Sequence, residues 1–156
     1  MRTLLASALV LVASVAAADP PPLTALFLGD AGHHQPAARF KQLEPVLAAR
    51  GIALTYTDAL ADLNPATLAK YDALVVYANH PKFADPAQEK ALLDFVAAGK
   101  GFVPLHCASY CFIDSKPYVD LVGGQFRSHA TGTFRVSNVA PEHPLMAGFC
   151  GFESWD

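Results

Sequence analysis

Short apolar runs alternate with segments of helical periodicity along most of this chain. The runs cover residues 23–28, 52–57, 71–77 and 101–105, and each is bounded by glycine, proline or polar residues. Continuous apolar runs of this length, rich in β-branched and aromatic residues, are typical of strands buried on both faces of a sheet. The pattern therefore predicts four strands, of which the first and the third are expected to be buried.

A helix is expected after each of these runs. A helix is expected from Pro36 to Gly51, with a kink or a break at Pro45, because proline lacks the N–H that the helix needs. Asp85-Pro86 begins another helix that ends at Gly99, and shorter helices are expected after Asn64-Pro65 and over residues 118–122. Residues 126–139 are expected to form strand pairs. Alternating strands and helices favour an α/β domain with a mostly parallel sheet between two helical layers.

The first 18 residues have the features of a secretory leader. Arg2 is followed by an apolar stretch over residues 3–15, and Ala16 to Ala18 provide a small-x-small cleavage site. The stretch is short for a membrane span, which needs about 20 residues. We expect cleavage after Ala18, a mature domain from Asp19 to Asp156, and a periplasmic or secreted protein with no membrane span. Residues 152–156 provide no closing helix or charged tail, and a compact sheet of this kind usually carries more chain, so we expect the domain to be incomplete at its carboxyl end.

Composition narrows the functional classes. With 11 Lys and Arg against 14 Asp and Glu, the formal charge of the 156-residue chain is −3. No basic cluster is available to displace counterions from nucleic acid, so nucleic-acid binding is not expected. Hydrophobic residues make up 53% of the chain, which argues against disorder. Nucleotide-binding, zinc-protease and esterase motifs do not occur in the mature chain.

Histidines follow several of the predicted strands. The first strand is followed by Asp30, His33 and His34. The third is followed by Asn79 and His80, and the fourth by His106. The carboxyl ends of parallel strands lie at one edge of a sheet, where ligands collect. We therefore expect His106 and one of His33 and His34 to share a pocket. His129 joins them if the Gly123-Gly124 turn brings the chain back.

The segment after the fourth strand places His106 and Cys107 at a strand-to-helix turn, where hydrolases and amidotransferases carry their nucleophile. His106 is the preferred functional residue, with a thiolate of Cys107 as the alternative. In an oxidising compartment the cysteines at 107, 111 and 150 form either one disulfide and one free thiol or three small hydrophobic side chains. A third alternative is a divalent metal ion held by His34, His106 and His129.

Several segments together resemble the ThuA-like, or trehalose-utilisation, family. They are Gly32-His33-His34, Tyr71-Asp72 before an apolar strand, residues 99–106, Gly123 to His129, and His143-Pro144-Leu145. The resemblance implies a flavodoxin-like fold similar to class I glutamine amidotransferases, with His106 where those enzymes carry a nucleophilic cysteine. It therefore argues against glutamine hydrolysis and implies a role in sugar metabolism.

Three hypotheses follow for the function. In the first, the domain is a carbohydrate-active enzyme of isomerase or hydrolase type. His106 and His129 then act as acid/base groups or metal ligands, while Asp30, His33, His34 and Arg127 contact a disaccharide or keto-sugar. In the second, the same edge of the sheet binds a sugar or a partner domain without turnover, as a module of a larger secreted protein. In the third, the chain is a structural domain of such a protein.

Overall fold

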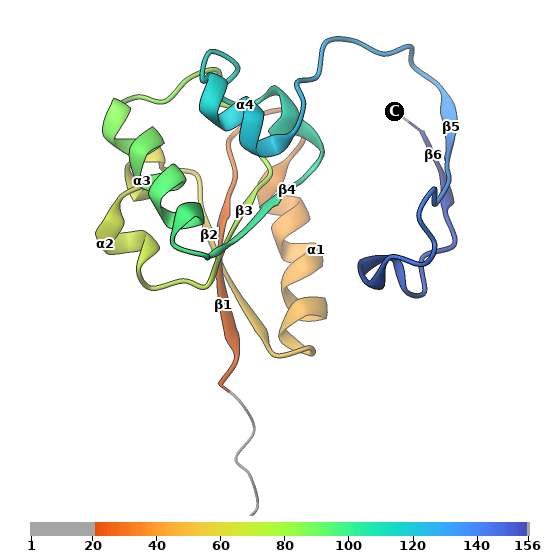
Figure 1. The fold of residues 1–156 in the computed structure, drawn as a ribbon, viewed down its shortest axis with the longest axis horizontal. Helices are drawn as coiled ribbons and strands as arrows, with labels where there is room; N and C mark the ends of the chain where they lie inside the picture. Colours follow the sequence, from red (N-terminus) through yellow and green to blue (C-terminus); the bar gives the residue numbers. More distant parts are fainter. Residues whose placement is uncertain (1–20, 156) are drawn as a thin grey trace, which may run out of the picture.

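The computed structural model describes residues 21–155, so the expected leader lies outside the described residues. Its centre is a parallel four-stranded sheet in the order β2-β1-β3-β4. The first strand therefore lies inside the sheet, with hydrogen bonds to a neighbour on each side (Figure 1). The strands are β1 (Leu23–Leu28), β2 (Ile52–Thr57), β3 (Ala73–Val76) and β4 (Gly101–Pro104). All four predicted strands are confirmed.

Helices cover both faces of this sheet, as the alternating pattern predicts. The pleat sends Leu26 and Leu28 into one core and Phe27 into the other. Helix α1 (Pro36–Ala48) packs on the face that carries Phe27, through Phe40 and Leu43. The opposite face is covered by α2 (Pro65–Leu68), α3 (Pro86–Ala97) and α4 (Lys116–Val122).

Polar side chains fix the starts of three helices. Asn64, Asp85 and Ser115 each accept a hydrogen bond from a backbone N–H in the first turn of α2, α3 and α4. Helix α1 continues through Pro45 to Ala48, so the expectation of a break there is wrong. The proline lies in the last turn of the helix, which ends at Ala48, shortly before Gly51 with its left-handed backbone.

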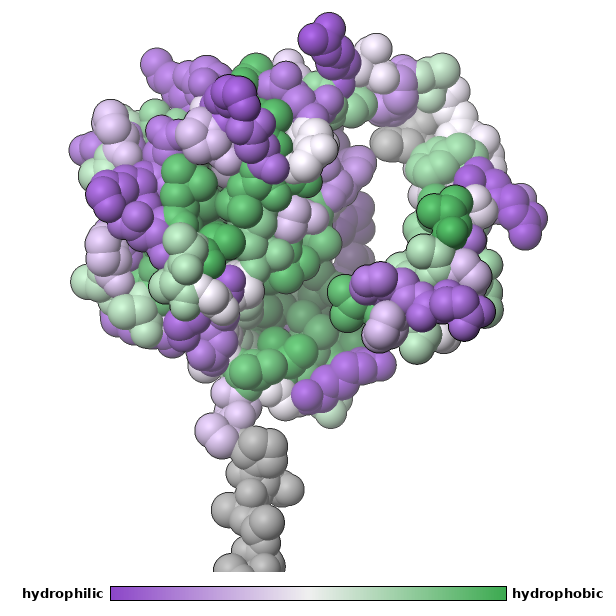
Figure 2. All heavy atoms as spheres, in the orientation of Figure 1, coloured by the Kyte–Doolittle hydropathy of each residue, from purple (hydrophilic) through white to green (hydrophobic). Residues whose placement is uncertain are grey.

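The face that carries α1 is only partly covered within the described residues. A groove of about 430 Å³ runs between α1 and the sheet and is lined almost entirely by apolar side chains, including Leu23, Leu47, Val75 and Val103. Val103 on β4 is 42% exposed and Leu23 58%. Apolar side chains gather on this side of the molecule (Figure 2).

The last part of the chain forms a separate two-stranded sheet. Strand β5 (Thr133–Val136) pairs antiparallel with β6 (Phe152–Trp155), and the pair stands beside the main sheet in Figure 1. The prediction of strand pairs within residues 126–139 is therefore wrong, because β5 finds its partner after a further loop and the short 3-10 helix at Pro144–Met146. No helix among the described residues is long and apolar enough to span a membrane.

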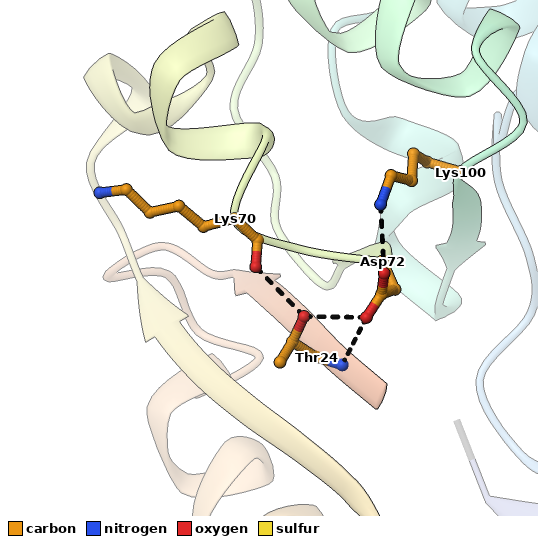
Figure 3. Close-up of polar contacts among 4 residues, drawn as sticks. All are labelled: Thr24, Lys70, Asp72 and Lys100. Carbon is orange, nitrogen blue, oxygen red and sulfur yellow. Dashed lines mark hydrogen bonds and ion pairs between the residues drawn. The ribbon is translucent and has the colours of Figure 1, made fainter. Parts of the chain in front are cut away.

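A polar cluster ties the sheet together at the amino ends of its strands (Figure 3). One carboxylate oxygen of Asp72 accepts hydrogen bonds from both the N–H and the hydroxyl of Thr24, each at 3.0 Å. The other oxygen lies 3.1 Å from Nζ of Lys100. These bonds join the starts of β1, β3 and β4, at the end of the sheet opposite the histidines.

The same bonds make stability depend on pH. Hydrogen bonds from Thr24 and Lys100 lower the pKa of Asp72 below its ordinary value of 3.8. The folded state therefore holds the proton less tightly than the unfolded chain does. The carboxylate stabilises the fold above about pH 3.8, and this contribution is lost as the pH falls toward the lowered value.

We expect Asp72→Asn to lower the melting temperature at neutral pH and to flatten its dependence on pH below 4. Thermal unfolding followed by circular dichroism across that range is the measurement. Asp94→Asn is the matched control, because Asp94 forms an exposed ion pair with Lys90 on one helix, and such pairs contribute little. Equal effects of the two substitutions would contradict a special role for the Asp72 cluster.

Candidate functional site

A cavity of about 400 Å³ lies at the carboxyl ends of β1, β3 and β4. It occupies the position where the strand order changes direction, which is the usual ligand site of such sheets. Five of the six predicted site residues line it, Asp30 being the exception. Its lining consists of His33, His34, Asn79, His106, Cys107, Ser109, Tyr110, Phe126, Arg127 and His129.

The loop after β1 brings both of its histidines to the cavity, whereas only one was expected to face it. The strict alternation of a strand does not apply here, because the loop turns and Gln35 has a left-handed backbone (φ 54°) before α1 begins. Asp30 holds this loop in place through hydrogen bonds to the backbone. Its carboxylate accepts hydrogen bonds from the backbone N–H groups of Gly32 (2.6 Å) and Asn79, so it joins the loop to the end of β3.

Three imidazole rings lie next to one another. The ring centroids of His34 and His106 are 4.8 Å apart at 90°, and those of His33 and His34 are 3.9 Å apart. Tyr77 of the loop after β3 contacts both His34 and His106, at 6.2 and 6.0 Å. The prediction that His106 and the His33-His34 loop share one pocket is confirmed.

His106 has an unusual backbone. It begins the 3-10 helix η2 (His106–Tyr110) directly after β4, and its φ angle is +46°. A residue with a Cβ in this left-handed region is strained by roughly 1–3 kcal/mol, and such strain is concentrated at functional sites. The turn holds the imidazole at the edge of the sheet, exposed and beside His34.

The chain returns to the cavity after α4. Gly123 ends that helix with a φ of +86°, which favours glycine. Two hydrogen bonds then hold the returning segment against η2 and the turn after it: Phe126 N–H to the Ser109 carbonyl and the Gln125 side chain to the Ile113 carbonyl, both at 3.0 Å. This segment places Arg127 and His129 in the lining, as expected for the Gly123-Gly124 turn.

Three lining residues were missed by the sequence analysis: Ser109, Tyr110 and Phe126. The first two follow His106 within one short helix, so their proximity to the site was available in the sequence spacing. Phe126 carried no such signal, because apolar residues before a strand are ordinarily core. His80, which also follows β3, does not line the cavity. Its Nε2 lies 3.0 Å from the Gly29 carbonyl and its ring stacks on Phe112, so it has a structural position.

The alternatives of a metal ion and a disulfide gain no support from the geometry. Among residues 21–155, no three His, Cys, Asp or Glu side chains are grouped so as to hold a metal ion. The cysteines at positions 107, 111 and 150 are all free thiols. Cys107 and Cys111 are buried and behave as small hydrophobic side chains, whereas Cys150 is exposed.

Cys107 lines the cavity but is poorly suited to nucleophilic attack. Burial and the nearby charge of Asp30 raise the pKa of its thiol to about 12, so the thiolate is scarce near neutral pH. We expect Cys107→Ser to leave turnover of a carbohydrate substrate within a few-fold of the parent rate. The measurement is a rate assay combined with a melting curve. Cys111→Ser is the control, because it also places a serine hydroxyl at a buried cysteine position and so reports the cost in stability of burying that group. A loss of several orders of magnitude at unchanged melting temperature would identify Cys107 as the nucleophile.

Comparison with known proteins identifies the family to which the chain belongs. The family model described as ThuA, trehalose utilisation, matches residues 24–156, which is most of the chain. The chain belongs to the ThuA family. A crystal structure of a ThuA-like protein from Bacteroides uniformis superposes with a TM-score of 0.73 at 18% identity. That superposition confirms the α/β fold of this ThuA-family chain, covering 90% of it but only 61% of the Bacteroides protein. No curated protein matches the chain.

Proposed function

We propose that this ThuA-family domain is a carbohydrate-active enzyme that uses imidazole acid/base chemistry. The observation that carries the proposal is the contact between His34 and His106 in a cavity at the carboxyl ends of the strands, with His106 in a left-handed turn. Trehalose utilisation, the description of the family, supports a sugar as the substrate. A positioned imidazole pair supplies both a proton acceptor and a proton donor near neutral pH.

The character of the lining favours one type of reaction. Four histidines and Arg127 line the cavity, and no carboxylate is among the described residues that do so. Glycosidases ordinarily need two carboxylates, so glycosidic hydrolysis by that mechanism is disfavoured. Proton transfer next to a carbonyl group of a keto-sugar suits the site better. One neutral imidazole removes the proton from carbon, and a protonated one donates to the carbonyl oxygen to give an enediol.

Arg127 and His129 complete this proposal. Arg127 is exposed in the cavity lining, where a guanidinium can bind the oxygen on which negative charge develops. His129 contacts the ring of Phe126, with centroids 5.4 Å apart, and lines the same cavity. We assign His106 and His34 to proton transfer, and His33, Arg127 and His129 to substrate binding or to a second proton transfer. Asp30 acts by holding the His33-His34 loop.

The second candidate is a binding module without turnover. His33, His106, Arg127 and His129 are all exposed, so the site is open and could hold a sugar without excluding water. Both candidates require carbohydrate binding, and only the enzyme requires reaction.

One experiment separates them. The purified chain is incubated with trehalose and with a keto-hexose, and binding and product formation are both followed by proton NMR. Solvent deuterium entering the carbon next to the carbonyl is the expected result for the enzyme, and its loss in His34→Ala would place the proton transfer in this cavity. Binding without exchange or product would support the module, and no binding of either sugar would overturn the proposal.

We also propose export of the protein. The composition of residues 1–18 is the support, and residues 1–20 lie outside the described structure. Expressed with its own leader in a bacterium, the protein is expected in the periplasm with Asp19 as its first residue. Amino-terminal sequencing that finds Met1 on a cytoplasmic product would contradict export.

A further inference from the structure

Two aromatic side chains without an assigned role lie in the lining of the histidine cavity. Tyr110, at the end of η2, is 45% exposed, and Phe126, on the segment that returns after α4, is 39% exposed. Large aromatic rings contribute most to stability when they are buried, so exposure of two neighbouring rings inside a cavity is not explained by packing.

The two rings form a defined surface. Their centroids are 5.9 Å apart and their planes meet at 87°, an edge-to-face arrangement. The hydrogen bond from Phe126 N–H to the Ser109 carbonyl fixes the two backbones relative to one another. Phe126 also contacts the His129 ring at 5.4 Å. The surface is therefore held in place before any ligand binds.

We propose that Tyr110 and Phe126 form an aromatic platform that receives the C–H face of a pyranose ring. This inference rests on the proposed carbohydrate function and adds the orientation and ring form of the substrate. A pyranose has a face of C–H bonds and an edge of hydroxyl groups. Aromatic rings attract the polarised C–H bonds, while the nearby Ser109 and Arg127 offer polar partners for the hydroxyl groups.

The platform predicts a preference that polar groups alone would not give. A cyclic sugar such as trehalose presents two pyranose rings, whereas sorbitol carries hydroxyl groups on an open chain and has no ring face. If hydroxyl recognition alone determined binding, the two would differ little. With a platform, trehalose is bound more tightly, and removal of an aromatic ring reduces that difference.

The test uses trehalose and sorbitol as probes and measures affinity by NMR titration of the full chain. Tyr110→Ala and Phe126→Leu are expected to weaken trehalose binding by about 2-fold to 12-fold, the range that corresponds to about 0.5–1.5 kcal/mol for an aromatic contact. Sorbitol binding should change much less. Tyr110→Phe keeps the ring and should keep the affinity, and Phe126→Leu still tests the platform if Tyr110→Ala fails to fold.

A second readout and a control make the outcomes distinct. In the parent protein, ring C–H protons of bound trehalose should shift upfield through the aromatic ring current, and the shift should fall in Phe126→Leu. Phe134→Leu is the matched control, since Phe134 is 46% exposed on β5 and does not line the cavity. Equal trehalose affinity in all variants, with no ring-current shift, overturns the platform but leaves the carbohydrate proposal standing. Failure of the parent to bind trehalose overturns the platform as well as trehalose recognition.

Discussion

Replacing His106 by alanine is expected to lower the rate of proton exchange in a keto-sugar by about 10²- to 10⁴-fold, the range typical of a positioned acid or base. The ring that is removed lies 4.8 Å from His34 and stacks on Tyr77, and His106 itself is exposed at the edge of the sheet. The exchange rate measured by NMR at saturating substrate is the readout. His143→Ala is the control, because His143 caps a distant 3-10 helix and does not line the cavity.

A glycine at position 106 is expected to separate the effect on activity from the effect on stability. His106 has a φ of +46°, which glycine adopts without strain, so His106→Gly is expected to keep or raise the melting temperature while it removes the activity. His80→Ala is expected to lower the melting temperature and to keep the activity, since the His80 ring stacks on Phe112 and forms a hydrogen bond with the Gly29 carbonyl. If His106→Gly loses stability and activity together, His106 is a structural residue and the proposed mechanism is wrong.

Phe27→Ala is expected to give the largest loss of stability in the chain, about 3–5 kcal/mol. Phe27 lies on the central strand, is fully buried, and contacts the rings of Phe40, Tyr56 and Tyr77 at 5.9–6.3 Å. Alanine would leave a cavity between α1 and the sheet, which could close only if α1 moved toward the sheet. The measurement is urea unfolding followed by circular dichroism.

Activity should also respond to this core substitution. Tyr77 contacts Phe27 on one side and the His34 and His106 rings on the other, so it joins the core to the site. Loss of Phe27 should therefore lower the exchange rate under conditions where the protein remains folded. Phe134→Ala, on the exposed strand β5, should change stability by less than about 0.5 kcal/mol, and a loss as large as that of Phe27→Ala would contradict the assignment of the core.

Periodicity predicted the main sheet because each strand gives a short, largely apolar run, although only the inner strands β1 and β3 are mostly buried. Parallel strands then bring the segments after Leu28 and Pro104 to one edge, which is why the proximity of His34 and His106 was predictable without a structure. The glycine pair at 123 and 124 similarly indicated the return of His129.

Other features depend on contacts that a linear pattern does not contain. The left-handed backbone of His106 arises from the junction of β4 and η2, and a histidine alone does not reveal it, because most histidines adopt a negative φ. Asp30 was expected to contact substrate because a carboxylate after a strand is a common ligand, yet its oxygens accept N–H groups of Gly32 and Asn79. The partner of β5 lies across a long loop, and pairing over such a distance leaves no local signal.

The two ends of the sheet perform different tasks, and this has an evolutionary consequence. The Thr24, Asp72 and Lys100 cluster joins the strands at their amino ends, whereas the cavity residues lie on segments after their carboxyl ends. Substitutions in those segments can change substrate preference without loosening the strand pairing. A library that varies positions 33, 110, 126 and 127 should therefore retain a large fraction of folded members, and new specificities are best selected from it.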